Sequence, residues 1–244
     1  LPFETSRPES VLAMLSTDRL GGLSVTAPFK DRMLDACVRV SKEAAAVGAV
    51  NTLLPADGGG LVGENTDVLG VRDALSGAGA QASSGRAAAV LGAGGGARAA
   101  ALALRNMGFQ VTLLARSLDK AKSFAEVHGI ALGSLSSASL ESVKPSVVVH
   151  ATPVGGLGRD PNERLLPEFR AEAGVIVHDL VYRPAMTAFL RESAATGAHA
   201  VSGLEMFLAQ ARAQLSLFVH RDLDASVLRG FLAGADAGGQ AAVP

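Results

Sequence analysis

The sequence predicts an α/β protein of two domains, in which a doubly wound parallel sheet follows a smaller α/β domain. From residue 87 onward, strand-like apolar runs alternate with helix-length segments, the pattern of a parallel sheet with helices between its strands. A glycine-rich turn joins the first of these strands to the first helix. A small polar stretch, residues 77–86, separates this half from an N-terminal half with a hairpin pattern, and is the predicted crossing between the domains.

The bulk composition is that of a globular protein. The chain has 244 residues, enough for two ordinary domains, and 48% of them are hydrophobic against 18% charged. No run approaches the ~18 consecutive apolar residues of a membrane-spanning helix. The first residues lack the basic and apolar regions of a signal peptide. We therefore predict no membrane partner.

Charge and cysteine content exclude further classes of protein. Cys37 is the only cysteine, so an internal disulfide is impossible and a thiolate metal site is not expected. The net charge of −1 gives no basic footprint for nucleic acid. No His pair or carboxylate cluster has the spacing of a metal site. We expect a reduced, cytoplasmic protein without metal, as a monomer or a homodimer.

The N-terminal half is predicted from short patterns bounded by Gly and Pro. Pro28 suits the first turn of a helix that follows a strand. Residues 55–59, Pro-Ala-Asp-Gly-Gly, have the chemistry of a hairpin turn. The predicted helices are 9–15, 29–38, 41–47 and 68–76, and the predicted strands are 23–27, 49–54 and 60–63.

The second half is predicted from its regular alternation. The expected strands are 87–91, 110–115, 147–151, 174–180 and 198–201, with helices at 97–107, 117–128 and 185–196. Two amphipathic helices, 203–218 and 223–232, and a Gly/Ala-rich tail, 234–244, follow. We predict domains at 1–80 and 81–202, with C-terminal helices at 203–244 that complete the first domain.

The glycine-rich turn fits the pattern G-x-G-x-x-G/A between a strand and a helix, the position of the dinucleotide site in a Rossmann-type fold. The first glycine permits the tight turn, the second lets a pyrophosphate approach the backbone, and a small last residue lets helix and strand pack closely. A flexible loop in a Gly/Ala-rich protein is the alternative. The predicted cofactor-binding residues of the turn are Gly92, Ala93, Gly94, Gly95, Gly96 and Ala97.

The end of the second strand indicates which dinucleotide binds. An acidic residue roughly 20 positions after the glycines binds the 2′-hydroxyl of NAD, but Arg116 follows the strand here. Its guanidinium suits a phosphate, Lys120 lies one helical turn further on, and Ser117 could cap the helix and donate to the same phosphate. We predict that Arg116, Ser117 and Lys120 bind the 2′-phosphate of NADP. A solvated basic residue is the alternative.

Polar side chains before the glycine turn gather where predicted strands end. They form three clusters: Ser24, Thr26 and Lys30; Asn51 and Thr52; Asn65, Thr66 and Asp67. A Lys–Asp pair is chemically sufficient for a carbonyl reductase, because the ammonium can donate to the reacting oxygen and the carboxylate can hold it. The residues alone leave two other readings open, a solvated helical Lys30 and a helix-capping Asp67. His150 and His178 lie in predicted buried strands, where packing is the expected role.

Several blocks, in this order, resemble those of shikimate dehydrogenases. Residues 23–30, LSVTAPFK, are similar to N-V-T-x-P-x-K. Residues 48–53 contain G-A-V-N-T, and residues 63–70 fit G-x-N-T-D-x-x-G. The glycine turn through Arg98, residues 115–117, residues 151–155 (ATPVG), residues 179–182 and residues 203–210 also fit. The resemblance covers residues from about 3 to 218.

The resemblance implies reversible reduction of 3-dehydroshikimate to shikimate by NADPH, with Lys30 and Asp67 as the catalytic pair. It implies contacts from Thr26, Asn51, Tyr182 and Gln210 to the substrate hydroxyls or carboxylate. It also implies contacts to the cofactor from Thr152, and places Gly203 and Met206 near the nicotinamide. Substrate is expected in a cleft between the domains.

The sequence departs from the family pattern at several points. Members usually begin with a segment whose serine hydroxyls hold the substrate carboxylate, and the printed sequence starts just after that point. We expect carboxylate recognition and activity to require such a segment. Ser24 stands where Asn is usual, Ala115 where Asn often precedes the Arg, and Gly156 where Met is common. Ala115 removes one possible adenosine contact.

Two rival functions remain open. A quinate/shikimate dehydrogenase of broader specificity is a close alternative, although such enzymes often use NAD, which Arg116 disfavours. A non-catalytic, dinucleotide-binding regulatory protein of the same fold is the other. The presence of both Lys30 and Asp67 counts against that second alternative.

Overall fold

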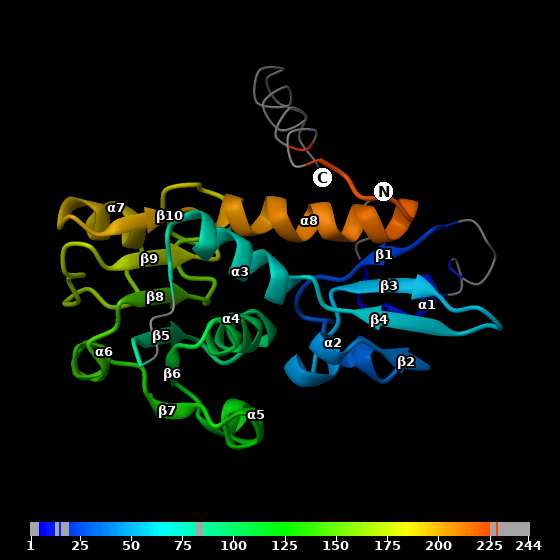
Figure 1. Ribbon diagram of the computed structural model, residues 1–244, viewed down its shortest axis with the longest axis horizontal. Helices are drawn as coiled ribbons and strands as arrows, with labels where there is room; N and C mark the ends of the chain where they lie inside the picture. The colour runs from blue at the N-terminus through cyan, green and yellow to red at the C-terminus, as the bar shows by residue number, and fades with distance from the viewer. Residues whose placement is uncertain (1–4, 13–14, 16–19, 82–84, 225–227, 229–244) are drawn as a thin grey trace.

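The computed structural model of the chain describes residues 5–12, 15, 20–81, 85–224 and 228. It has two lobes, each built around one β-sheet (Figure 1). The small lobe contains a four-stranded mixed sheet and the large lobe a six-stranded parallel sheet. This confirms the predicted fold class, a doubly wound parallel sheet beside a smaller α/β unit.

The small lobe is organised by a hairpin. Strands β3 (Thr52–Pro55) and β4 (Leu61–Glu64) pair antiparallel, as the Pro-Ala-Asp-Gly-Gly turn predicts. Strand β1 (Leu23–Ser24) pairs antiparallel with β3, and β2 (Arg39–Val40) pairs parallel with β4. Helices α1 (Glu9–Leu12) and α2 (Lys42–Val47) and a 3₁₀ turn (Arg32–Leu34) complete the lobe.

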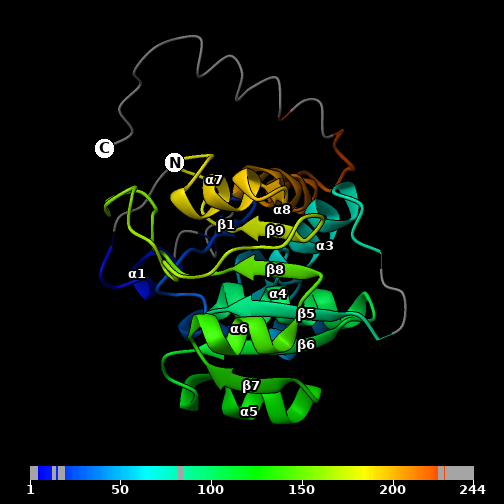
Figure 2. The same cartoon turned by 90° about the vertical axis from the view of Figure 1, so that its left-hand side faces the viewer.

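The large lobe has the strand order β10-β9-β8-β5-β6-β7, and all neighbouring strands are parallel. Figure 2 shows this spatial order from top to bottom for β9, β8, β5, β6 and β7. The chain starts in the middle at β5, moves outward to β7, then returns to β8 and moves outward on the other side. The order therefore reverses between β5 and β8, and ligands bind at such switch points in open α/β sheets. The strands are β5 (Ala87–Leu91), β6 (Gln110–Ala115), β7 (Ala131–Ser134), β8 (Val147–His150), β9 (Ile176–Asp179) and β10 (His199–Val201).

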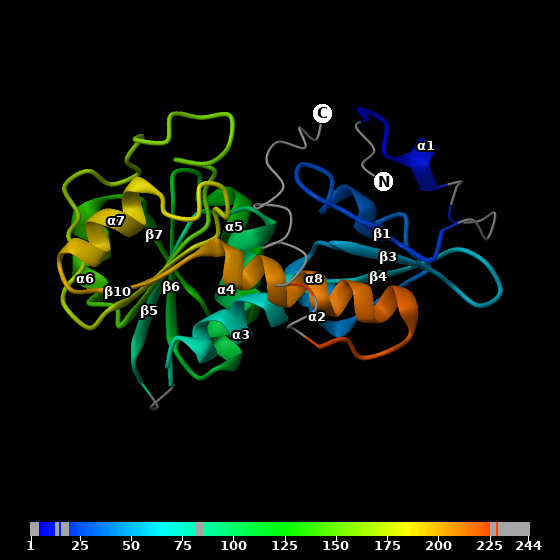
Figure 3. The same ribbon diagram turned by 90° about the horizontal axis from the view of Figure 1, so that it is seen from above.

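Helices cover both faces of this sheet (Figure 3). Helices α4 (Gly95–Asn106) and α5 (Asp119–His128) lie on one face, and α6 (Ser137–Val143) and α7 (Ala188–Ala195) on the other. Strand β5 is therefore buried on both of its faces. Ala88 and Val90 belong to one apolar cluster, and Ala89 and Leu91 belong to a second one. A strand covered on both faces needs a continuous apolar run, which is why 87–91 was recognisable in the sequence.

Two long helices connect the lobes. Helix α3 (Asp67–Gly77) leaves the small lobe and packs on α4 and on α8 (Gly203–Val219), which returns from the large lobe (Figure 1). Gly70 of α3 allows close approach, since a Cβ there would lie 2.9 Å from Cβ of Gln210. The chain thus passes between the lobes along α3, and the predicted crossing at 77–86 lies at the far end of that helix.

The predicted helix 29–38 is wrong. Residues 27–36 form turns around the short 3₁₀ helix, and the following residues extend to pair with the edge of the small sheet. Backbone bonds explain the difference, because Val38 donates to Leu61 O and the carbonyl of Lys30 accepts from Val50 N. These tertiary bonds outweigh the helical spacing of the apolar side chains.

Other boundaries differ by a few residues. The predicted strand 23–27 is only two residues long, and the helix expected at 9–15 is described over Glu9–Leu12. Elements β2, β7 and α6 were not predicted at all. The predicted helix 223–232 and the tail 234–244 lie almost wholly outside the described residues. None of the helices in the described ranges is long and apolar enough to cross a membrane.

Candidate active site

A cleft of about 830 Å³ lies between the lobes. Its small-lobe wall includes Thr26, Lys30, Asn51 and Asp67. Its large-lobe wall includes the glycine turn after β5 and the loops after β8 and β9, and α8 contributes the remaining side. Residues from three separate sequence motifs therefore line the same cleft.

Lys30 and Asp67 form an ion pair in this cleft. Nζ of Lys30 lies 2.6 Å from Oδ2 of Asp67, and the carboxylate side chain is only 4% exposed against 22% for the lysine. Lys30 lies in a turn rather than in a helix. Asp67 is the first residue of α3, but its carboxylate does not cap the helix, because its two oxygens accept from Lys30 and Asn51 and the N-cap position is Thr66. Both alternative readings of the pair are thereby excluded by geometry.

Asn51 fixes the carboxylate from the other side. Its Nδ2 donates to Oδ1 of Asp67 at 2.8 Å and to Oγ1 of Thr66 at 2.9 Å, while its Oδ1 accepts from Thr66 N and from Thr52 Oγ1. The side chain is fully buried at 1% exposure. A buried polar network is stable only when its members are satisfied, and this one is. Asn51 therefore positions Asp67 as well as lining the cleft.

Helix α8 brings two glutamines to the same corner. Gln210 lines the cleft, with Oε1 3.4 Å from Oγ1 of Thr66. Gln214, one turn further, donates to Asn51 O and to Thr52 Oγ1 and accepts from Ser24 Oγ. Gln214 was missed by sequence reasoning. Its spacing of four from Gln210, which places both on one helix face, was the available signal.

Thr26 and Tyr182 lie on opposite walls of the cleft. Thr26 is exposed in the segment after β1, and Tyr182 follows β9 with 43% of its surface exposed. The tyrosine ring stacks on Phe207 of α8 at 4.7 Å between centroids. This stacking fixes the ring in the wall of the cleft, and its hydroxyl has no partner among the described residues.

The glycine turn has the geometry of a phosphate loop. Gly92 has φ of 132°, and a Cβ there would lie 2.8 Å from the carbonyl oxygen of Ala151, so the switch point between β5 and β8 requires glycine. Gly94 is different, because its backbone (φ −77°, ψ −178°) suits any residue and a Cβ would meet nothing within 4 Å. The fold has no need of glycine at this position, and its bare backbone lines the cleft.

The residues present therefore fit a dinucleotide pyrophosphate. Helix α4 begins at Gly95, and the free N–H groups of its first turn attract an anion. Gly94, Gly95 and Gly96 all line the cleft, and Ala97 is completely buried against the sheet. Ala93 completes the turn between Gly92 and Gly94. This arrangement is the one that the glycine pattern predicted.

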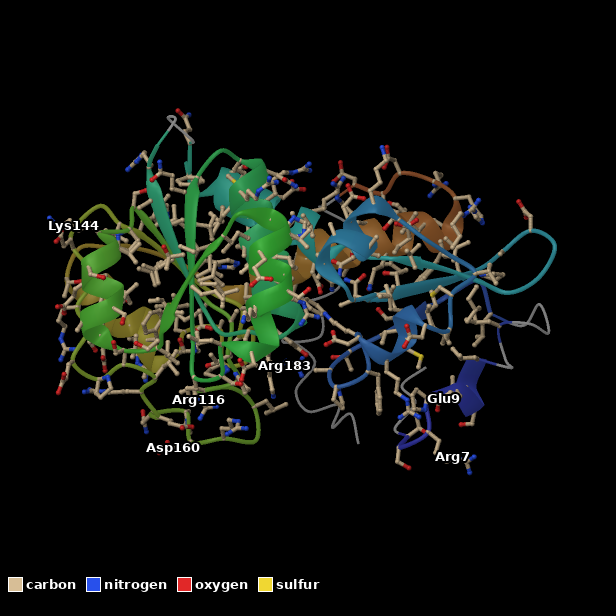
Figure 4. All side chains as sticks on the ribbon, turned by 90° about the horizontal axis from the view of Figure 1, so that it is seen from below. Arg7, Glu9, Arg116, Lys144, Asp160 and Arg183 are labelled. Carbon is tan, nitrogen blue, oxygen red and sulfur yellow. The ribbon has the colours of Figure 1, made fainter. Side chains whose placement is uncertain are left out.

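Arg116, Ser117 and Lys120 follow β6 and are all exposed. Figure 4 shows Arg116 on the same side of the molecule as Arg183, which lines the cleft. None of the three side chains has a hydrogen-bond or ion-pair partner among the residues that the structure describes. The helix-capping role suggested for Ser117 is wrong, since Leu118 is the N-cap of α5 and no side chain caps this helix.

The loop after β8 is supported by buried polar groups. Oγ1 of Thr152, which lines the cleft, lies 2.7 Å from Nε2 of His150, and Nδ1 of that ring is in close contact with Asp179 at 2.8 Å. Asp179 also accepts from Val181 N and Thr187 Oγ1. His150 thus supports the cleft wall as well as packing in the sheet.

Gly203 and Met206 begin α8 beside this wall. Met206 lines the cleft, whereas Gly203 is not among the lining residues. A Cβ on Gly203 would collide with the carbonyl of Val181, so glycine is needed there for the helix to start against the β9 loop. No group of three or more His, Cys, Asp or Glu side chains in the described ranges could hold a metal ion.

Two titratable groups outside the cleft have shifted pKa values. Burial lowers the pKa of His178, although Val201 O, Asp179 and Glu205 act in the opposite direction. Nδ1 of His178 lies 3.0 Å from Val201 O and therefore carries the hydrogen, and Nε2 has no partner among the described residues. Burial raises the pKa of the Cys37 thiol. His178 is thus a neutral core residue, as its strand position predicted.

A doubly wound sheet whose glycine turn faces a Lys–Asp pair across a cleft defines a dinucleotide-dependent dehydrogenase. Comparison with known proteins identifies the family. A family profile described as the shikimate dehydrogenase substrate binding domain matches residues 2–53. A shikimate dehydrogenase (NADP(+)) of Oleidesulfovibrio alaskensis is 36% identical over 238 residues, covering 95% of this chain and 83% of the relative. The chain belongs to the shikimate dehydrogenase family.

Solved structures agree with this assignment. Shikimate 5-dehydrogenase from Thermus thermophilus, in complex with NADP(H) and shikimate, is 35% identical with a TM-score of 0.74, covering 89% of this chain and 81% of that one. Quinate dehydrogenase from Corynebacterium glutamicum, in complex with NAD, is 28% identical with a TM-score of 0.76, covering 92% and 82%.

Proposed function

We propose that the chain catalyses the reversible, NADP-dependent reduction of 3-dehydroshikimate to shikimate. The observation that carries this proposal is the Lys30–Asp67 pair in the same cleft as the glycine turn. The near full-length similarity to shikimate dehydrogenases that use NADP supports the substrate and the cofactor.

Lys30 is the proposed acid in the direction of reduction. Bound NADPH supplies the hydride. The Lys30 ammonium donates to the carbonyl oxygen of the substrate and gives it a proton as negative charge develops there. In the reverse direction the amine accepts the proton from the shikimate hydroxyl.

Asp67 and Asn51 keep this group in place. Asp67 balances the charge of Lys30 through Oδ2, and Asn51 holds the carboxylate through Oδ1. A lysine side chain has several rotatable bonds, so the 2.6 Å contact reduces the entropy that must be lost when substrate binds. We also propose that Asp67 accepts a hydrogen bond from a neighbouring substrate hydroxyl.

Thr26, Asn51, Tyr182 and Gln210 are the proposed substrate contacts. All four line the cleft around Lys30, and each offers a hydroxyl or an amide to a hydroxylated carboxylic acid. Because the Asn51 amide hydrogens already serve Asp67 and Thr66, a substrate contact from Asn51 has to share them.

The proposed cofactor contacts follow the length of NADP. Within residues 92–97, Gly94, Gly95 and Gly96 line the cleft and receive the pyrophosphate, while Gly92, Ala93 and Ala97 shape the turn. Arg116, Ser117 and Lys120 receive the 2′-phosphate. Thr152 and Met206, which line the cleft, are the proposed contacts to the nicotinamide, and Gly203 is proposed to lie near it at the start of α8. Arg116 rather than an acidic residue stands directly after β6, and the nearby Asp119 belongs to helix α5, which supports NADP over NAD.

We propose domain boundaries at 1–80 and 81–202, with 203–244 returning to the first domain. The small sheet comes from residues 23–64, the large sheet from residues 87–201, and α8 begins at Gly203, which supports these limits. The protein is proposed to be cytoplasmic, and a monomer or a homodimer, with no nucleic-acid or membrane partner. The lone cysteine supports a reducing compartment.

The test is turnover by the purified full-length protein, followed by the absorbance of the reduced cofactor. Shikimate with NADP⁺ is expected to be the best of four pairs, the others being shikimate with NAD⁺ and quinate with each cofactor. The likeness to quinate dehydrogenase makes quinate with NAD⁺ the informative rival. Higher kcat/KM for that pair would assign the broader function. No turnover with any pair, despite NADPH binding, would assign a non-catalytic role.

A further inference from the structure

Asp31 is an acidic residue beside the phosphate loop that the proposed reaction does not use. It follows Lys30, lines the cleft, and its side chain is 61% exposed. Its Oδ1 lies 3.6 Å from the point where a Cβ on Gly95 would be. The carboxylate therefore stands next to the first turn of α4, on the side that faces the small lobe.

Arg98 holds the Asp31 carboxylate in this place. One guanidinium nitrogen, Nη2, donates to Oδ1 of Asp31 at 2.7 Å, and Nε donates to Val47 O at 2.7 Å. The arginine is 9% exposed, with Gly48 O and Ala93 O as longer contacts. Because three backbone carbonyls outside α4 contact the guanidinium, it is held in place, and the carboxylate that it binds is kept near the turn.

The Asp31 carboxylate disfavours the binding of an anion at the start of α4. Only two acidic residues line the described cleft, and Asp67 is already paired with Lys30. Asp31 leaves one oxygen without a partner among the described residues, and it neutralises Arg98, the cation buried behind the turn. Because the Asp31 side chain of this pair is 61% exposed and the Arg98 side chain only 10%, a pyrophosphate at the start of α4 is repelled by the nearer carboxylate and gains little from the guanidinium.

We propose that Asp31 limits the affinity of the protein for its dinucleotide by repelling the pyrophosphate. The inference rests on the proposed function only in that the glycine turn binds a dinucleotide. Its consequence is faster release of the cofactor after each turnover. Asp31 is thus an affinity-determining residue rather than a catalytic one.

The test is the Kd of NADP⁺, measured by titration calorimetry without substrate. Asp31→Asn is expected to tighten binding roughly threefold to tenfold, the effect of removing one charge at partly screened distance. Asp31→Glu keeps the charge and should leave the Kd unchanged. Asp35→Asn is the matched control, because Asp35 is exposed on the same segment and does not line the cleft.

A second probe separates local repulsion from a general change in charge. 2′-AMP contains the adenosine and its 2′-phosphate but no pyrophosphate, so its Kd should be the same for the wild type and Asp31→Asn. Equal tightening of both probes, tightening by Asp35→Asn, or an unchanged Kd for NADP⁺ would overturn the proposal. If Asp31→Asn tightens NADP⁺ but the wild type turns over no substrate, the affinity role stands and the proposed function fails.

Discussion

The two ends of the proposed substrate and cofactor site are built in opposite ways, and only the first of them lines the cleft. The proposed catalytic corner, formed by Lys30, Asp67 and Asn51, is linked by hydrogen bonds, and its carboxylate and amide are buried. The proposed ribose turn, formed by Arg116, Ser117 and Lys120, is exposed, and its side chains have no partners among the described residues.

The difference fits the role proposed for each end. A proton donor must be positioned before the reaction, because only a preorganised group stabilises the developing charge without further cost. A phosphate clamp can be ordered by the ligand itself, since guanidinium and ammonium groups bind a dianion strongly when it arrives. Substitutions in the corner should therefore change turnover, and substitutions in the ribose turn should change cofactor binding.

The largest effect is expected from Lys30→Ala. It removes the proposed acid and should lower kcat about a thousandfold while changing the KM for NADP⁺ little. Steady-state kinetics with shikimate and NADP⁺ measure both constants. Lys42→Ala changes an exposed lysine at the start of α2 and is the control, which should leave both kcat and KM unchanged. An unchanged kcat in Lys30→Ala would remove this residue from the mechanism.

Asp67→Asn should lower kcat about a hundredfold. The amide has no charge to balance Lys30, and its hydrogens would face either Nζ of Lys30 or Nδ2 of Asn51, both of which are donors. The readout is again kcat at saturating substrates, with the folded state checked by thermal unfolding. Asp73→Asn, at a half-buried position of the same helix that does not line the cleft, is the matched control. Equal kcat values for the two variants would show that the corner is not preorganised by Asp67.

Arg116→Ala should raise the KM for NADP⁺ by about tenfold to a hundredfold and leave kcat nearly unchanged. The expected size is that of a lost charge-assisted hydrogen bond, ~1.5–3 kcal/mol. The KM for NAD⁺ should not rise, because NAD⁺ lacks the 2′-phosphate. Arg105→Ala, exposed near the end of α4, serves as control. A preserved preference for NADP⁺ would mean that the clamp lies elsewhere.

The smallest effect concerns the pH dependence of stability, through His178 in strand β9 of the large sheet. Since burial lowers the pKa of His178, the unfolded chain binds a proton more readily than the native one as the pH falls below the ordinary value of 6.5. Stability is therefore lost toward acid pH. His178→Asn should reduce this loss by a few degrees in Tm, whereas His199→Asn, at an exposed position of β10, should not. Identical Tm-against-pH curves for wild type and His178→Asn would contradict the neutral, buried state of this ring.

Sequence reasoning worked where local chemistry and tertiary structure agree. Strand 87–91 and the glycine turn were predictable, because a strand buried on both faces is continuously apolar and the turn requires φ above zero at Gly92. The catalytic corner was not predictable from spacing, since residues 30, 51 and 67 meet only through the small sheet and the start of α3. The family blocks supplied that link.

The failures have physical causes as well. The segment 29–38 has helical spacing, but its backbone bonds to β4 and to Val50 exclude a helix. Strand β7 and helix α6 have small and polar residues with little periodicity, and they exist because β7 adds to the edge of β6 and Ser136 caps α6. The pairing of Asp31 with Arg98 was not predictable from the sequence, because it joins residues of different lobes.

A double-mutant cycle between Lys30→Ala and Arg116→Ala tests the division between the two ends most directly. The kcat with shikimate and the Kd of NADP⁺ are measured for the wild type, both single variants and the double variant. The account predicts that kcat depends only on Lys30, that Kd depends only on Arg116, and that the two effects add within about 0.5 kcal/mol. A loss of NADP⁺ affinity in Lys30→Ala, or a loss of kcat in Arg116→Ala, would contradict it.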